Sequence, residues 1–145
     1  MTTAAALHLV TTLAMFGLIV FVQVVHYPLM SKVGRESSAA YAKAHTDRTG
    51  LVVGPLMLPE LATAIWLVAF PPAPDLVLAA RVGLVLLVGI WIVTALASVP
   101  CHRRLLEGFD LATHRRLVRT NWMRTALWAG RVPIALMLAG WVPPG

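Results

Sequence analysis

The sequence has only one cysteine, Cys101, among its 145 residues. An intramolecular disulfide and a cluster of thiolate metal ligands are therefore both excluded within one chain. Charge is also scarce, since 12% of the residues are charged and 59% are hydrophobic, with a mean hydropathy of +0.78. A soluble domain needs about 25% charged residues to cover its surface. The excess of apolar surface is expected to face lipid, which makes the bilayer the first predicted partner.

Acidic residues are few, and the formal net charge is +6. The basic residues flank apolar runs, so anionic headgroups and orientation in a membrane explain them. The sequence offers no soluble basic domain that could bind nucleic acid, and we expect no such partner. The length allows one domain, residues 1–145.

Four apolar runs predict membrane spans at about residues 5–26, 51–70, 76–99 and 123–142. Each is near the roughly 20 residues needed to cross the hydrocarbon core. Three prolines within residues 71–75 predict a turn, and Pro100 is expected to stop the third span. Polar stretches at 27–50 and 101–124 have helical periodicity and predict one amphipathic helix each. The predicted fold is an all-α integral membrane four-helix bundle of two parallel helical hairpins, each with a cytoplasmic amphipathic helix.

The distribution of basic residues predicts the orientation. The two polar stretches hold 10 of the 12 Lys and Arg residues, whereas the 71–75 turn holds none. The positive-inside rule places both stretches in the cytoplasm and both termini outside. The predicted location is the inner (cell) membrane of a bacterium.

A shift of 71 positions aligns several unusual residues of the two halves. Glu36 aligns with Glu107, and Glu60 aligns with Arg131. This pattern predicts two parallel repeats related by an axis along the membrane normal, although few identities support it.

The aligned residues Glu60 and Arg131 are expected at the same depth, about 13 Å from the cytoplasmic face at ~1.5 Å per residue. An ionisable group at that depth is costly and usually faces the bundle interior with a partner. We expect the two side chains to be buried together, either as a packing salt bridge or as catalytic groups.

Histidines end the predicted spans on the cytoplasmic side. His26 and His102 close the first and third spans, and His45 lies on the first amphipathic helix. Together with Glu60 they are expected to reach one cavity open to the cytoplasm, as iron, copper or zinc ligands. His26 and His102 could instead be axial ligands of a haem, act as catalytic acid–base groups, or simply hydrogen-bond to loop backbone. His8 is expected to be an interfacial residue apart from the others.

The fourth predicted span presents a cationic and aromatic stripe. Arg124, Trp128 and Arg131 recur at helical spacing, with Asn121 nearby. Such a groove suits an anionic or planar aromatic ligand. Substrate binding is therefore assigned to Asn121, Arg124 and Trp128, and to Gln23, which lies one turn before His26.

Several strings of the sequence carry a resemblance to known proteins. They are His26-Tyr27-Pro28, Arg48-Thr49-Gly50, Pro55 through Glu60, Cys101-His102 through Gly108-Phe109-Asp110, and Asn121-Trp122 through Trp128. In these strings the chain resembles small bacterial four-helix membrane proteins, which are distantly similar to anthrone oxygenase-like membrane proteins. The resemblance implies oxygenase- or oxidoreductase-like activity on a small aromatic or lipophilic substrate. It supplies no catalytic motif, so the site residues above rest on depth and chemistry.

Two other classes of function remain open at this point. A mid-membrane acidic residue and parallel repeats are also features of a small proton-coupled transporter. An exposed basic face would suit an accessory subunit of a membrane complex. Gly83 and Gly89 on the third span permit close helix contacts, so a homo-oligomer is possible.

Overall fold

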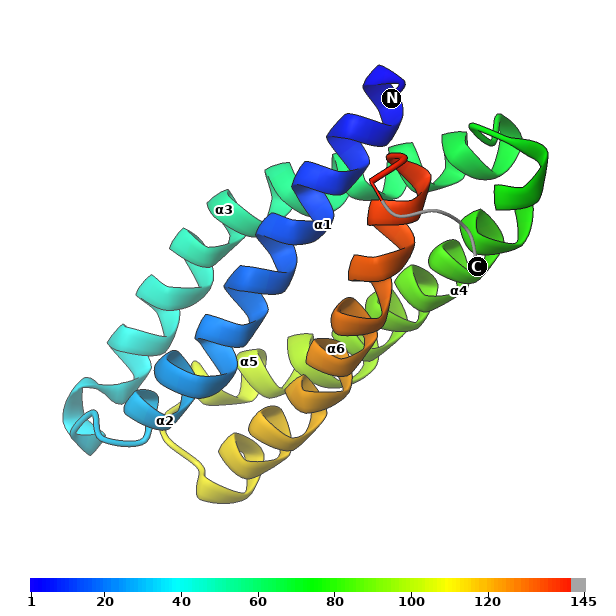
Figure 1. Cartoon of the computed structure of the whole chain (residues 1–145). Coiled ribbons are helices and arrows are strands. Elements are labelled where there is room, and N and C mark those ends of the chain that lie inside the picture. The colour runs from blue at the N-terminus through cyan, green and yellow to red at the C-terminus, as the bar shows by residue number, and fades with distance from the viewer. Residues whose placement is uncertain (142–145) are drawn as a thin grey trace.

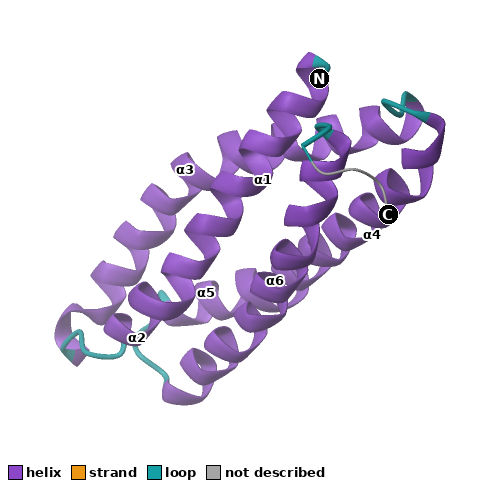
Figure 2. Ribbon diagram, viewed as in Figure 1, coloured by secondary structure: helices purple, strands orange, loops and turns teal. Residues whose placement is uncertain are grey.

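Long helices make up almost the whole of the computed structural model, which describes residues 1–141 (Figures 1 and 2). The helical segments are α1 (Thr3–Phe21), α2 (Tyr27–Met30), α3 (Arg35–Ala69), α4 (Val77–Val93), α5 (Val99–Leu105) and α6 (Leu111–Leu138). π-helical turns join α1 to α2 (Val22–His26) and α4 to α5 (Thr94–Ser98), and a 3-10 turn (Pro74–Leu76) precedes α4. No strand occurs in residues 1–141, as the prediction of an all-α chain requires.

Three helices are long and apolar enough to cross a membrane: Thr3–Met30, Arg35–Ala69 and Pro74–Leu105. α6 is of similar length, but it carries five arginines (Arg115, Arg116, Arg119, Arg124 and Arg131) and is not among them. The fourth predicted span thus remains a prediction, and its last residue, Val142, lies outside the described residues.

Buried clusters show how the long helices run. Ala5, Leu67, Leu76 and Leu138 pack together, so the start of α1, the end of α3, the start of α4 and the end of α6 meet at one end of the bundle. Tyr27, Ala42, Leu105 and Leu117 belong to a cluster at the other end. The four long segments therefore alternate in direction, and Figure 1 shows the N-terminus beside the last turns of α6.

The outer faces of the helices are apolar. Leu78 on α4, Val85 further along it and Leu96 in the following π turn are each about 70% exposed (71%, 69% and 70%). Exposed apolar area on this scale is unusual for a soluble monomer and suits contact with lipid.

The helix boundaries correct two predictions. The expected amphipathic helices are not separate elements: residues 35–50 are the first turns of α3, and residues 111–122 are the first turns of α6. Pro100 does not end the third long helix, and His26 does not end the first, since helix continues to Leu105 and to Met30. In both places a π turn lies just before the proline and rearranges the hydrogen bonds, so the missing proline N–H is tolerated.

Local signals set the helix starts. The side chain of Thr2 accepts the Ala5 N–H at 3.2 Å and caps α1. Asp110 caps α6 in the same way, accepting the Thr113 N–H at 2.8 Å. The hydrogen bonds from Thr113 lower the pKa of the Asp110 carboxyl. Between α3 and α4 the helix is interrupted by the proline-rich turn, at the place where the sequence predicts it.

Candidate functional site

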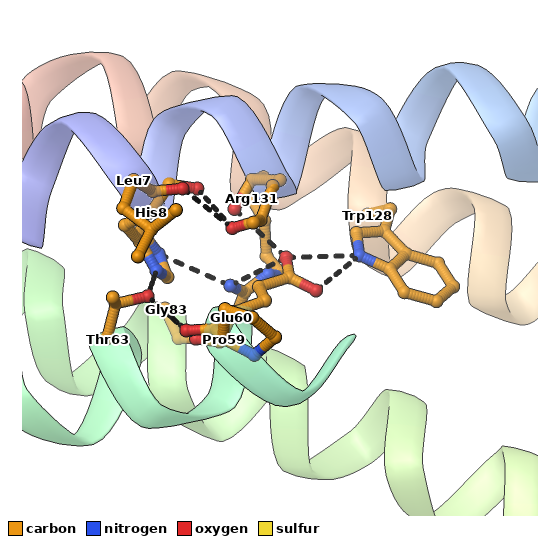
Figure 3. A network of polar contacts seen from close by, with 10 residues as sticks. Leu7, His8, Pro59, Glu60, Thr63, Gly83, Trp128 and Arg131 are labelled. Atoms are coloured by element: carbon orange, nitrogen blue, oxygen red, sulfur yellow. Dashed lines mark hydrogen bonds and ion pairs between the residues drawn. The ribbon is translucent and has the colours of Figure 1, made fainter. Parts of the chain in front are cut away.

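A buried group of polar side chains surrounds Glu60 (Figure 3). It includes His8, which lies near the start of α1. We call it the Glu60 network; its members are His8, Thr12, Glu60, Thr63, Trp128 and Arg131. Glu60 and Arg131 form an ion pair of 3.1 Å, and their side chains are 0% and 1% exposed. The predicted pairing of these two residues is thus confirmed.

Glu60 has several donors besides Arg131. Its carboxylate accepts the Thr12 hydroxyl at 2.9 Å and the Trp128 indole N–H at 3.2 and 3.3 Å. Arg131 in turn donates to the carbonyl oxygen of Gly83 on α4. A buried ion pair is tolerated when additional hydrogen bonds satisfy its remaining lone pairs and protons. The hydrogen bonds of Glu60 and of the terminal guanidinium nitrogens of Arg131 go far towards this condition, although Nε of Arg131 is buried without a hydrogen-bond partner. The network joins α1, α3, α4 and α6.

His8 is a member of this network, which corrects the expectation of an isolated interfacial residue. It is 3% exposed. One ring nitrogen lies 2.9 Å from the Thr63 hydroxyl, and the other lies 3.3 Å from the Arg131 guanidinium. The signal in the sequence was the spacing of His8, Thr11, Thr12 and Met15, which places all four on one helix face.

A second polar centre surrounds a cavity of about 160 Å³ nearer the other end of the bundle. Its walls are mainly apolar, with Met15, Leu18, Ile19, Val22 and Val53 among them. Tyr27, His45, Ser98, His102 and Arg124 add polar groups. An engineered protein cavity of about 150 Å³ holds benzene, so this cavity can enclose a single aromatic ring.

The two π turns supply polar side chains to this region. Each turn buries one residue, Gln23 in the first and Ser98 in the second. The Asn121 amide donates to Gln23 at 2.8 Å, and the Arg124 guanidinium lies 3.5 Å from the Ser98 hydroxyl and 3.1 Å from the Asn121 carbonyl oxygen. Local π turns are frequent at functional sites, and here both turns adjoin the same cavity, through Val22 in the first and Thr94 and Ser98 in the second.

Tyr27 and His102 form a pair at the cavity. The Tyr27 hydroxyl lies 3.2 Å from Nε2 of His102, and Tyr27 is 2% exposed. The other ring nitrogen of His102, Nδ1, is buried without a hydrogen-bond partner. Sequence reasoning missed Tyr27, and the only signal for it was its place between His26 and Pro28.

The three histidines His26, His45 and His102 gather as the sequence predicts. The His45 ring lies 4.2 Å from His26 and 5.4 Å from His102, centroid to centroid. His45 lines both the cavity and a more open pocket that His26 and Arg48 share. It therefore lies between the cavity and the surface.

Glu60 does not join these histidines, which corrects the expectation of one His/Glu cavity. It is absent from the cavity lining, and its carboxylate is occupied by Thr12, Trp128 and Arg131. Among residues 1–141, no group of three or more His, Cys, Asp or Glu side chains is arranged to hold a metal ion. The predicted set His26, His45, Glu60 and His102 is therefore not a metal site in this geometry.

A haem held between His26 and His102 does not fit either. The space is close to one aromatic ring in volume, far below a porphyrin. The ring of His45 also contacts both histidines.

The predicted substrate-binding residues meet in one place. Gln23, Asn121, Arg124 and Trp128 are all at most 7% exposed, and hydrogen bonds or a cation–π contact connect Gln23 to Asn121, Asn121 to Arg124, and Arg124 to Trp128. Comparisons with protein-family models, curated proteins and solved structures found no match.

Proposed function

We propose that the protein is an integral membrane enzyme of the oxidoreductase or oxygenase class, acting on a small lipophilic substrate held in the cavity. The observation that carries the proposal is an apolar, ring-sized cavity in contact with the buried Tyr27–His102 pair. Ligand sites are typically concave and apolar, with a few convergent polar groups. The resemblance to oxygenase-like membrane proteins supports the reaction class.

In the proposed reaction His102 acts as the general base. When its Nε2–H donates to the Tyr27 oxygen, the unpartnered Nδ1 keeps a lone pair for a substrate proton. Loss of that proton leaves an electron-rich substrate anion. In the oxygenase form of the proposal, a carbanion formed at an activated CH2 group gives one electron to the co-substrate dioxygen, and the resulting substrate radical and superoxide combine to form a C–O bond. The peroxide takes back the proton from His102, and the hydroperoxide eliminates water to leave a carbonyl group, so one oxygen atom enters the substrate and the other leaves as water. Arg124 in the cavity wall would stabilise the negative charge as it develops.

Glu60 and Arg131 are positioning residues in this proposal, although the sequence suggested direct catalysis for both. Neither lines the cavity. Glu60, which is paired with Arg131, accepts the indole N–H of Trp128, and the guanidinium carbon of Arg124 lies 5.4 Å from the centre of the same ring system. Their contribution to the site would thus pass through Trp128.

The proposal includes four membrane spans, with α6 as the fourth, in the cell membrane of a bacterium. It places both termini and the 71–75 turn outside, and the polar segments at residues 27–50 and 101–124 in the cytoplasm. The basic residues in those segments and the exposed apolar faces of α4 support this arrangement. The His45 side of the cavity would then face the cytoplasm.

A proton-coupled transporter is less well supported. Such a carrier would require Glu60 to exchange protons with water during transport. The carboxylate is fully buried and accepts hydrogen bonds from three side chains. This arrangement favours a fixed structural charge.

Turnover by purified protein in lipid nanodiscs tests the proposal. Oxygen uptake and product formation would be followed with small lipophilic phenols and aromatic ketones, comparing the parent protein with His102→Ala. We expect activity to fall about 100-fold or more in this variant, the usual effect of losing a general base. Lys43→Ala is the matched control, because Lys43 is exposed and pairs only with Asp47. Equal activity of His102→Ala and the parent would refute the assignment.

Metal analysis and a visible absorption spectrum of the same sample test the cofactor question. A Soret band or stoichiometric iron, copper or zinc would overturn the assignment of the chemistry to Tyr27, His102 and Arg124 alone.

A further inference from the structure

Two buried arginines on α6 have opposite electrostatic surroundings. Arg124 and Arg131 lie seven residues apart, about two helical turns, and they are 7% and 1% exposed. Arg131 pairs with Glu60 at 3.1 Å. Within residues 1–141, Arg124 has no Asp or Glu within ion-pair distance. One arginine is therefore neutralised, and the other is a buried cation without a counter-ion.

All the partners of Arg124 are neutral. It donates to the Asn121 carbonyl oxygen at 3.1 Å, lies 3.5 Å from the Ser98 hydroxyl, and has its guanidinium carbon 5.4 Å from the centre of the Trp128 ring system. Its Nε is buried without a hydrogen-bond partner. A buried charge is costly unless it is paired, and such charges inside membranes usually mark a ligand or ion site.

The surroundings keep Arg124 available for an anion. Asn121 is held by Gln23 through its amide nitrogen at 2.8 Å, so its oxygen is directed to the guanidinium. Arg124 lines the cavity, and no Asp or Glu is among the described residues that line it. The missing negative charge has to come from outside the protein chain.

We propose that the cavity binds a small aromatic or unsaturated acid as its anion, a carboxylate or phenolate, with the negative group on Arg124 and the ring against Met15, Ile19 and Val22. A planar guanidinium matches a carboxylate through two parallel hydrogen bonds. The cavity volume limits the apolar part to about one ring. This inference rests on the proposed function for its cavity and names the class of substrate.

The headgroup of an anionic lipid could offer the same negative charge. The ring-sized cavity favours the small acid, because a lipid would also have to place a long acyl chain beside Arg124. Nanodiscs made of phosphatidylcholine alone, or with added phosphatidylglycerol, distinguish the two sources.

The test is a binding titration of the full-length protein in phosphatidylcholine nanodiscs, measured by calorimetry. The probes are benzoate and its neutral analogue benzamide. We expect benzoate to bind at least about tenfold more tightly, as a charge-assisted bidentate contact should provide. Arg124→Gln should reduce benzoate binding to the level of benzamide. Arg119→Gln, an exposed arginine on the same helix, should leave it unchanged.

The possible outcomes have separate meanings. Equal binding of benzoate and benzamide by the parent protein overturns the anion site but keeps the cavity. No binding of either probe overturns the cavity and the proposed function together. Loss of benzoate binding when phosphatidylglycerol is added assigns the charge to a lipid and overturns the small acid. The comparison of benzoate with benzamide uses the parent protein alone, so it decides the proposal even if Arg124→Gln fails to fold. Retained benzoate binding in Arg124→Lys would support the role of the positive charge.

Discussion

Trp128 donates its indole N–H to both carboxylate oxygens of Glu60, at 3.2 and 3.3 Å, while the guanidinium carbon of Arg124 lies 5.4 Å from the centre of its ring system. The tryptophan therefore connects the ion pair in one half of the bundle with the cavity in the other. It is 0% exposed, so its orientation is fixed by packing as well as by the hydrogen bonds. Substitutions at Trp128 and at each arginine can therefore test separately the role of Arg131 in the ion pair and the role of Arg124 at the cavity.

The ion pair should behave as one unit in a double-mutant cycle. Glu60→Gln or Arg131→Met alone leaves an uncompensated buried charge, and each should destabilise the protein by about 3–5 kcal/mol. The double variant should lose clearly less than the sum of the two. Thermal or denaturant unfolding in detergent micelles measures this. Additive losses would show that the two charges do not depend on each other.

Trp128→Phe should lower the stability of the protein more than it lowers benzoate binding. The variant keeps an aromatic ring near Arg124 but removes the donor to Glu60. We expect a loss of about 1.5–3 kcal/mol, the usual value for a hydrogen bond to a charged group, with benzoate binding changed less than in Arg124→Gln. Unfolding and calorimetry on the same preparation give both quantities. Stability equal to that of the parent would show that the indole N–H contributes nothing to the network.

Tyr27→Phe should affect turnover more than substrate affinity. The hydroxyl that fixes His102 would be lost, while the ring would still fill its buried place. We expect kcat to fall by about tenfold, below the effect of losing the base itself, with little change in KM. Tyr41→Phe is the matched control, because the ring of Tyr41 stacks on His26 and keeps that contact without its hydroxyl. A change confined to KM would point to substrate contact instead.

Cysteine labelling should reveal the orientation. In a Cys101→Ser background, single cysteines at Ser37 and Asp75 would report the start of α3 and the α3–α4 turn, both exposed. An impermeant maleimide applied to intact cells should label Asp75→Cys and leave Ser37→Cys unlabelled until the membrane is opened. The reverse pattern would invert the proposed topology. Labelling of both positions in intact cells would contradict a single membrane span between Ser37 and Asp75.

The residues show which parts of this site the sequence could predict. The Glu60–Arg131 pair was predictable because burial of charge in an apolar segment demands a partner, and counting residues along two helices gives their depth. The position of His8 was mispredicted because depth alone does not say which face of a helix turns inward. The separation of Glu60 from His45 and His102 could not be predicted. It depends on which donors Glu60 meets across the bundle, Thr12 and Trp128, and these come from two other helices.

The continuity of α3 and α6 also could not be predicted from the sequence. Their first turns are polar enough to suggest separate surface helices, but both helices continue without interruption through residues 50–51 and 122–123, even at Gly50. The effect of proline was misjudged at Pro100, because a π turn absorbs what would otherwise be a break.

The π turns at Val22–His26 and Thr94–Ser98 also determine how this protein could be altered. A π turn contains one more residue than the α-helical turn it replaces, and one residue corresponds to about 100° of rotation around the helix axis. Removing a single residue from the first turn would convert it to α-helix and swing either His8 and Thr12 or Tyr27 and His26 away from their partners. The insertion lets one helix direct its first half to the ion pair and its second half to the cavity. Deleting or inserting one residue at these two turns, rather than substituting residues, would therefore most directly change how the Glu60 network and the cavity are oriented relative to each other.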